Sequence, residues 1–263
     1  GAVLGRRLPL VVFSHAYTAD RSVYTTLVAD LASRGYIVAS VDHTSDAFAV
    51  QFPSGEVVPG VFGSPLASDP ISDPRLASLI NVRVADVRFV TTLLLKWNAA
   101  RGGWLSGRID AQRIGVFGHS LGGATAVRAA SVDPRFRASI DIDGSLFGRW
   151  PLTTRSHKPL LVFTAQDGLG SVFAEDKVCR YLRAARQPKL VWRLDGAKHL
   201  SFSDFQVLAP QIAEYEPGWQ FATLYQAITG SLEPDRSVRA QRESIARFFG
   251  AYLGRTPARS RPR

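Results

Sequence analysis

The sequence predicts a single α/β domain in which a mostly parallel central sheet is flanked by helices. The chain of 263 residues is 46% hydrophobic, which suits one such domain with a substantial core. Short apolar runs alternate with segments of helical period, and this alternation is typical of βαβ units. Several of the runs are apolar at almost every position, as expected for strands buried on both faces of a parallel sheet.

The first βαβ unit begins at Leu8–Ser14, a near-continuous apolar run that predicts a buried strand. Arg21–Arg34 follows with apolar residues at helical spacing, and Gly35 is a typical residue for ending a helix. Tyr36–Val41 then predicts the second strand. A strand, a helix and a strand in this short distance indicate that the two strands run parallel.

Thr44–Leu76 interrupts this rhythm with five prolines and little periodicity. A loop of this length in a compact domain is usually functional or mobile, so we expect it to form a rim over the site. Its apolar side chains are then candidates for lining an acyl pocket: Phe48, Phe52, Val61 and Phe62. A surface excursion without a role in ligand binding is the alternative.

The remaining segments continue the alternation without a composition break or an internal repeat. The expected strands are Ile114–Ser120, Ala138–Ile142, Pro159–Thr164 and Leu190–Leu194, and the expected helices are Leu76–Asn98, Leu121–Ala130, Val172–Arg186 and Ser237–Leu253. Residues 1–254 are expected to form one domain. Residues 255–263 carry four arginines and are expected to form a basic, disordered tail.

The net charge of +10 raises the question of an anionic partner. The basic residues outside the tail are scattered and not clustered with aromatic residues, which favours a solvated surface over a nucleic-acid site. Examples are Arg83, Arg88, Arg128, Arg135 and Arg137. We therefore expect no nucleic-acid partner, weak contact with anionic lipid surfaces at most, and a monomer.

Cysteine content and hydropathy bound the class of protein further. Cys179 is the single cysteine, which excludes an intrachain disulfide, and no run reaches the roughly 18 apolar residues of a membrane span. The chain opens almost directly into a strand, without a basic and then apolar leader. A mature secreted protein would begin in the same way, and we favour a secreted location over a cytoplasmic one.

Residues 118–122, Gly-His-Ser-Leu-Gly, form a G-x-S-x-G pattern between an apolar run and an alanine-rich helical segment. In this context the pattern is typical of the nucleophile elbow of the α/β-hydrolase fold. Glycines two residues on either side relieve crowding at a sharp strand-to-helix turn, which exposes the serine hydroxyl. We therefore take Ser120 as the candidate nucleophile, with a chance glycine-rich turn as the alternative.

A serine nucleophile needs a base and an acid, which follow it in that fold in the order Ser, Asp or Glu, His. Of the two histidines after Ser120, His157 precedes a strand, whereas His199 lies just beyond a strand's carboxyl end, where such sheets collect their ligands. His199 is the candidate base. Asp143 and Asp167 both follow apolar strands at that edge, so residue chemistry leaves the acid open and slightly favours Asp167.

The oxyanion hole is expected to use two main-chain N–H groups. One belongs to Leu121, the residue after the nucleophile, and the other to Tyr17 in the loop after the first strand. Together these residues predict a serine hydrolase of short- to medium-chain carboxylic esters or lipids, with no metal or organic cofactor. The alternatives are a cutinase-like polyester hydrolase, a triacylglycerol lipase, or a non-catalytic binding protein on the same fold.

The chain resembles the platelet-activating factor acetylhydrolase family, in its monomeric α/β-hydrolase branch. The similarity runs through PLVVFSHAYTADRSVYTTLVADLASRGYIVASVDH, GRIDAQRIGVFGHSLGGATAV, DPRFRASIDIDGSLFG and KHLSFSDF, and it leaves out the proline-rich loop. It implies Asp143 as the acid, ahead of Asp167, with His199 as the base and the amides of Tyr17 and Leu121 as the oxyanion donors.

Two departures from the family pattern border the acyl pocket. The family's glycine after the first-strand histidine is Ala16 here, and the aromatic residue after its serine is Leu121. The family's acyl and head-group preferences are therefore not expected to apply. An esterase, lipase or polyester hydrolase is favoured over a mediator-lipid acetylhydrolase.

Overall fold

The structure is a computed structural model that describes residues 7–61, 74–147, 150, 157–166, 178, 181–184, 188–215, 225 and 227–254. The basic segment 255–263 lies outside these residues. Of the expected helix Val172–Arg186, the structure describes residues 178 and 181–184, all of them helical.

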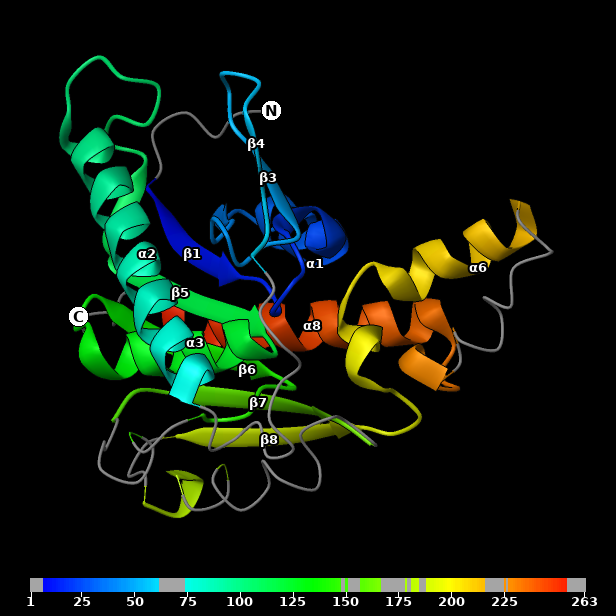
Figure 1. The fold of residues 1–263 in the computed structure, drawn as a ribbon. Helices are drawn as coiled ribbons and strands as arrows, with labels where there is room; N and C mark the ends of the chain where they lie inside the picture. Colours follow the sequence, from blue (N-terminus) through cyan, green and yellow to red (C-terminus); the bar gives the residue numbers. More distant parts are fainter. Residues whose placement is uncertain are drawn as a thin grey trace.

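The described strands form a six-stranded sheet in the order β2-β1-β5-β6-β7-β8, and every neighbouring pair is parallel (Figure 1). The predicted parallel α/β architecture is therefore confirmed. The strands are β1 (Leu8–Ser14), β2 (Ile37–Val41), β5 (Ile109–His119), β6 (Phe136–Ile142), β7 (Leu160–Ala165) and β8 (Lys189–Leu194).

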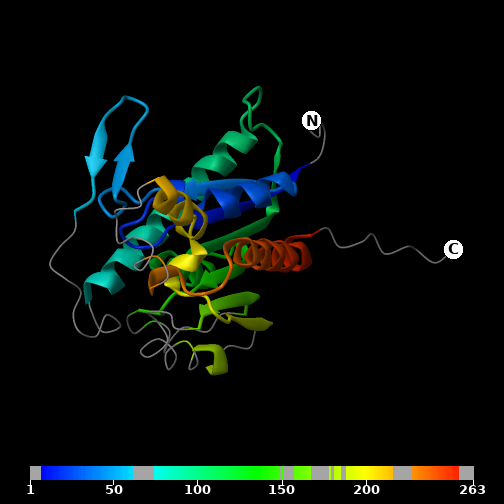
Figure 2. The ribbon, with the colours of Figure 1, turned by 90° about the vertical axis from the view of Figure 1, so that its right-hand side faces the viewer.

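Helices cover both faces of the sheet (Figures 1 and 2). Those on one face are α2 (Pro74–Ala99) and α3 (Leu121–Val132), and those on the other are α1 (Thr25–Ser33) and α8 (Pro234–Leu253). Alternate residues of β1 reach the two layers, since Leu10 and Val12 lie in the first cluster and Val11 and Phe13 in the second. Burial on both faces explains why β1 and β7 read as nearly unbroken apolar runs.

The order of the strands indicates which edge of the sheet carries the binding site. The chain leaves β1 through α1 to β2 on one side, and later returns through α2 to β5 on the other side of β1. The switch point therefore lies between β1 and β5, and in open α/β sheets ligands bind at the carboxyl ends of the strands there. These ends lead to His15 and to Ser120.

Two segments differ from the expectation. The Thr44–Leu76 loop contains an antiparallel hairpin of β3 (Ala49–Gln51) and β4 (Val57–Pro59), with Gly55 at φ 88° in its turn. These strands have three residues each, and half of these residues are exposed, so they lack the apolar runs that mark buried strands. Phe205–Tyr215 forms a further helix, α6, although Pro210 lies inside it. Within the described residues, no helix is long and apolar enough to cross a membrane.

The expectation that Arg83 lies at a solvated surface is wrong. Its side chain is wholly buried, whereas Arg88 on the same helix is half exposed, in keeping with the prediction. Arg83 falls seven residues after Leu76 and three after Ile80, both buried, so it shares the buried stripe of α2. An arginine at this spacing from two buried apolar residues is the feature of the sequence that could have indicated a buried, paired side chain.

Candidate active site

Ser120 lies on the sharp turn between β5 and α3, with φ 57° and ψ −122°. This is a conformation that a non-glycine residue rarely adopts, and it persists only where neighbouring groups hold it. The Ser120 N–H donates to the Ile142 carbonyl at 2.8 Å, and the Ser120 carbonyl accepts from the N–H groups of Gly123 and Ala124. The turn has the strained geometry of a nucleophile elbow.

The glycines of the motif are required by close backbone approach. A Cβ atom at Gly122 would overlap the carbonyl oxygens of Ser14 and His15, and one at Gly118 would overlap those of Ser14 and Gly122. The elbow is therefore pressed against the carboxyl end of β1. This brings Ser120 next to the loop that was predicted to supply the second oxyanion donor.

Asp143 and His199 meet at the same edge of the sheet. Asp143 follows β6 at φ 49°, and its Oδ2 lies 2.6 Å from Nδ1 of His199, which begins a short 3-10 helix after β8. The other oxygen, Oδ1, accepts the N–H of Ala165 at 2.9 Å. With the Nδ1 proton directed at the carboxylate, Nε2 of His199 is left as the proton acceptor, the tautomer a general base requires.

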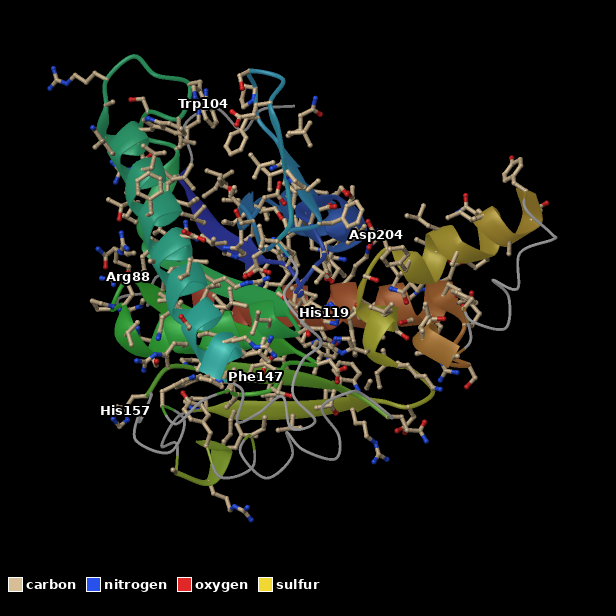
Figure 3. The ribbon with its side chains drawn as sticks, viewed as in Figure 1. Arg88, Trp104, His119, Phe147, His157 and Asp204 are labelled. Atoms are coloured by element: carbon tan, nitrogen blue, oxygen red, sulfur yellow. The ribbon has the colours of Figure 1, made fainter. Side chains whose placement is uncertain are left out.

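His119 links His199 to the elbow. Its ring centroid lies 4.5 Å from that of His199, and its Nδ1 lies 2.9 Å from the Tyr24 hydroxyl. Burial lowers the pKa of His119 well below its ordinary value, so the ring stays neutral. Figure 3 places His119 at the carboxyl end of β5. The imidazole of His199 therefore packs against the residue that directly precedes Ser120.

The sequence offered two further candidates, Asp167 and His157. Asp167, the alternative acid, lies outside the described residues. His157 is exposed, and Figure 3 shows it at the end of the sheet opposite His119, as its position before a strand predicted.

Asp141 is a buried carboxyl that sequence reasoning did not assign. Its Oδ1 accepts the Gly144 N–H at 3.0 Å, and burial together with the charge of Asp143 raises its pKa well above the ordinary value. Its Oδ1 also lies against Gly123, so this side chain braces the turn behind the elbow.

The two predicted oxyanion donors sit on either side of the switch point. Leu121 is the first residue of α3, where an N–H has no acceptor within the helix. Tyr17 lies in a tight turn closed by the Ala19 N–H and the Ala16 carbonyl at 3.2 Å, with Thr18 at φ 63°. Both amides thus belong to segments that leave the sheet at the same edge.

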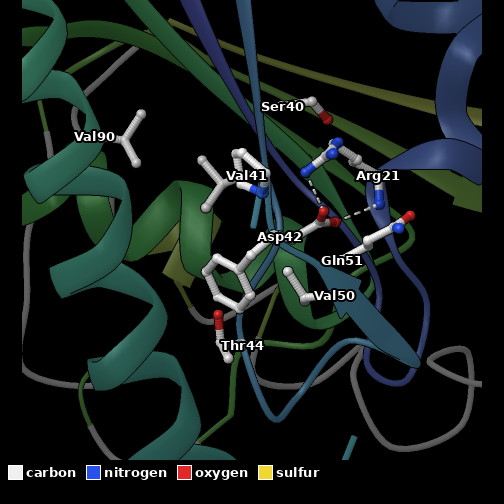
Figure 4. Close-up of a pocket in the computed structure, with 10 residues that line it drawn as sticks. Arg21, Ser40, Val41, Asp42, Thr44, Val50, Gln51 and Val90 are labelled. Carbon is white, nitrogen blue, oxygen red and sulfur yellow. Dashed lines mark hydrogen bonds and ion pairs between the residues drawn. The ribbon is translucent and has the colours of Figure 1, made fainter. Parts of the chain in front are cut away.

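A cavity of about 510 Å³ lies at the carboxyl end of β2, between the β3–β4 hairpin and α2 (Figure 4). The Arg21–Asp42 ion pair forms its polar wall, and of the predicted rim residues that the structure describes, Phe52 lines it. Phe48 and Val61 are largely exposed, and Phe62 lies outside the described residues. Among the described residues, no cluster of histidine, cysteine and acidic side chains is arranged to hold a metal ion.

The buried histidines make the stability of the folded chain depend on pH. Burial lowers the pKa of His15 from 6.5 to about 3, and it lowers those of His43 and His119 as well. Below about pH 6.5 the unfolded chain therefore binds more protons than the folded chain, so stability falls as the pH falls. Asp141 acts in the opposite sense, because its raised pKa makes the folded state bind the extra proton.

We expect the free energy of unfolding to decrease by up to about 3 kcal/mol per pH unit as the pH falls from 6.5 to 5, the net effect of roughly two protons. Urea denaturation at pH 7.5, 6.5 and 5.5 measures it. A His157→Gln variant, which changes an exposed histidine, should keep the same slope. Stability that is independent of pH across this range would show that these histidines are not neutral in the folded state.

The chain is similar in sequence to known proteins over most of its length. A family model described as "Platelet-activating factor acetylhydrolase, isoform II" matches residues 3–54 and 93–254. The platelet-activating factor acetylhydrolase of Cavia porcellus is 26% identical over 222 residues, covering 76% of this chain and 49% of that protein. That of Bos taurus is 28% identical over 274 residues, covering 95% and 58%.

Among solved structures, a ferulic acid esterase from Streptomyces cinnamoneus superposes with a TM-score of 0.76. It is 32% identical in sequence, and the match covers 98% of this chain and 72% of the esterase chain. The chain spans about half the length of the curated relatives it matches.

Proposed function

Because this chain belongs to the platelet-activating factor acetylhydrolase family, as its motifs predicted, we propose that it is a serine hydrolase of carboxylic esters. The observation that carries the proposal is the convergence at one sheet edge of a strained serine turn and an Asp143–His199 hydrogen bond of 2.6 Å. The acetylhydrolases and the ferulic acid esterase that the chain resembles support the same class of reaction.

The residues supply each step of ester hydrolysis. Ser120 Oγ attacks the ester carbonyl carbon while Nε2 of His199 takes its proton, and Asp143 stabilises the imidazolium that forms. The N–H groups of Leu121 and Tyr17 hold the oxyanion. His199 then gives the proton to the leaving alcohol. Water, deprotonated by His199, attacks the acyl-enzyme and releases the acid with Ser120 restored.

We expect the purified chain to hydrolyse p-nitrophenyl acetate and butyrate, and to lose this activity when a fluorophosphonate labels it once per molecule. Peptide mapping should place the label on Ser120. Heat-unfolded protein, which lacks the assembled site, serves as the control and should not be labelled. A folded chain that neither turns over the esters nor takes the label would be a binding protein on a hydrolase fold.

A second candidate is the hydrolysis of hydroxycinnamate esters, which the likeness to the ferulic acid esterase favours. This reaction would use the same proposed triad and would differ only in the acyl group that the pocket accepts. Methyl ferulate in the same assay distinguishes the two. A kcat/KM for methyl ferulate above those for acetyl and butyryl esters would favour the aromatic acyl group, and the reverse order would favour short aliphatic chains.

A further inference from the structure

Arg83 is a wholly buried cation whose hydrogen bonds go beyond its ion pair. Its Nε and Nη2 donate to the carboxylate of Asp46 at 2.5 and 2.8 Å. Its Nη1 also donates to the carbonyl oxygen of His15, and Nη2 lies 3.3 Å from that of Ala16. One guanidinium from α2 thus ties the buried Asp46 to the main chain directly after β1.

The Ala16 carbonyl is the point on which these interactions converge. It accepts from Nδ1 of His15 at 2.7 Å and from the N–H of Ala19 at 3.2 Å, in addition to the contact with Arg83. Three donors, from His15, Ala19 and Arg83, restrain the orientation of this carbonyl. A single weak turn hydrogen bond would allow the peptide to flip, whereas this arrangement does not.

The protonation of His15 is fixed by its neighbours. Its Nε2 accepts the main-chain N–H of His43 at 3.1 Å, so the ring proton must reside on Nδ1, which donates to Ala16. Burial and the nearby Arg83 charge lower the pKa of His15 to about 3, so the ring stays neutral. The donor that meets the Ala16 carbonyl is therefore present throughout the pH range in which an esterase would work.

Peptide planarity carries this constraint to the adjacent residue. The Ala16 carbonyl and the Tyr17 N–H belong to one peptide unit, which is trans, and the two groups point in opposite directions. Holding the carbonyl towards Arg83 and His15 therefore directs the Tyr17 N–H away from them. A carbonyl bonded to a cation also makes the N–H of the same peptide a stronger donor.

The preceding peptide is anchored to the elbow itself. The Ala16 N–H donates to the Tyr24 hydroxyl at 3.2 Å, and this hydroxyl bonds to His119, which precedes Ser120. The position of Ala16 is thus tied to the nucleophile on one side and to Arg83 on the other.

We propose that Arg83, held by Asp46, is a positioning residue that fixes the Ala16–Tyr17 peptide so that the Tyr17 N–H faces the developing oxyanion. The inference rests on the proposed function. It predicts that disturbing Arg83 impairs stabilisation of the tetrahedral intermediate more than it impairs binding of the ester.

An Arg83→Lys variant tests this, because lysine keeps the charge beside Asp46 but cannot make the bidentate pair and both carbonyl contacts together. We expect kcat for p-nitrophenyl butyrate to fall about 10- to 100-fold with KM changed less than threefold, short of the full loss of an oxyanion donor. The affinity for an alkyl trifluoromethyl ketone, which forms an oxyanion on the enzyme, should weaken by the same factor as kcat. Arg88→Lys, on the exposed side of the same helix, is the matched control and should match wild type in all three.

Because a buried ion pair that loses one partner destabilises the fold, a second variant removes both charges together. Arg83→Met/Asp46→Leu replaces the pair with apolar side chains of similar size, and circular dichroism monitors folding. This variant should fold and still show the loss in kcat and in ketone affinity. A folded Arg83→Lys or double variant within threefold of wild type in both quantities overturns the inference.

Wild-type turnover and fluorophosphonate labelling, measured first, separate this outcome from failure of the proposed function. If the wild type shows neither, both proposals fall. If it shows both and the variants match it, the role of Arg83 alone is wrong.

Discussion

Replacing Ser120 with alanine is expected to lower kcat for p-nitrophenyl butyrate by about 10⁶-fold, because the remaining groups contribute only residual catalysis once the nucleophile is gone. KM should change little, since the methyl group of alanine leaves the pocket and the oxyanion donors in place. Initial rates at enzyme concentrations of tens of micromolar measure it. The matched control is Ser131→Ala at the far end of α3, whose hydroxyl donates only to the Arg128 carbonyl and which should keep wild-type turnover.

The Ser120 variant also decides between Ser120 and Ser14, a second serine that lies in a hydrogen-bonded Ser–His–Asp chain. Ser14 Oγ lies 2.9 Å from Nε2 of His43, and Nδ1 of His43 lies 2.8 Å from Asp86. Ser14 is wholly buried at the end of β1, so an ester cannot reach it, and its φ is not positive as that of Ser120 is. Activity that survives in Ser120→Ala at more than a hundredth of the wild-type rate would contradict the assignment of Ser120.

The parts of the fold that the sequence predicts are those that local chemistry determines. β1 and β7 are buried on both faces, so apolar runs mark them, and α2 and α8 carry helical periodicity. The β3–β4 hairpin has strands of only three residues, half of them exposed, so neither an apolar run nor a periodicity marks it in the sequence.

The residues of the site likewise fall into those that the sequence predicts and those that only the fold reveals. Ser120 and His199 follow from a local motif and from position after a strand. Arg83 and Asp46 lie 37 residues apart, and only the folded chain shows that they form a buried pair beside the loop that follows β1. Asp143 and Asp167 both follow strands, so strand order alone could not separate them. The 2.6 Å contact with His199 is a property of the assembled sheet edge.

Asp143→Asn is expected to lower kcat by about 10⁴-fold while leaving the fold intact. Asp143 Oδ1 accepts the Ala165 N–H, and Oδ2 accepts the Nδ1 proton of His199. An asparagine can satisfy the Ala165 N–H only with its oxygen, which turns its NH₂ group towards Nδ1. His199 must then carry its proton on Nε2, where it cannot accept the proton of Ser120.

The Ala165 N–H fixes the orientation of the asparagine side-chain amide, and this orientation is the wrong one for catalysis. The substitution is therefore expected to do more harm than the loss of the negative charge alone. Asp143→Ala removes the carboxylate without imposing that tautomer, so it should retain more activity than Asp143→Asn if the tautomer is decisive. Steady-state kinetics of both variants and of Asp167→Asn, at equal folded fractions, provide the comparison. A greater loss of kcat in Asp167→Asn than in Asp143→Asn would assign the acid to Asp167, and the hydrogen bond between Asp143 and His199 would then be structural.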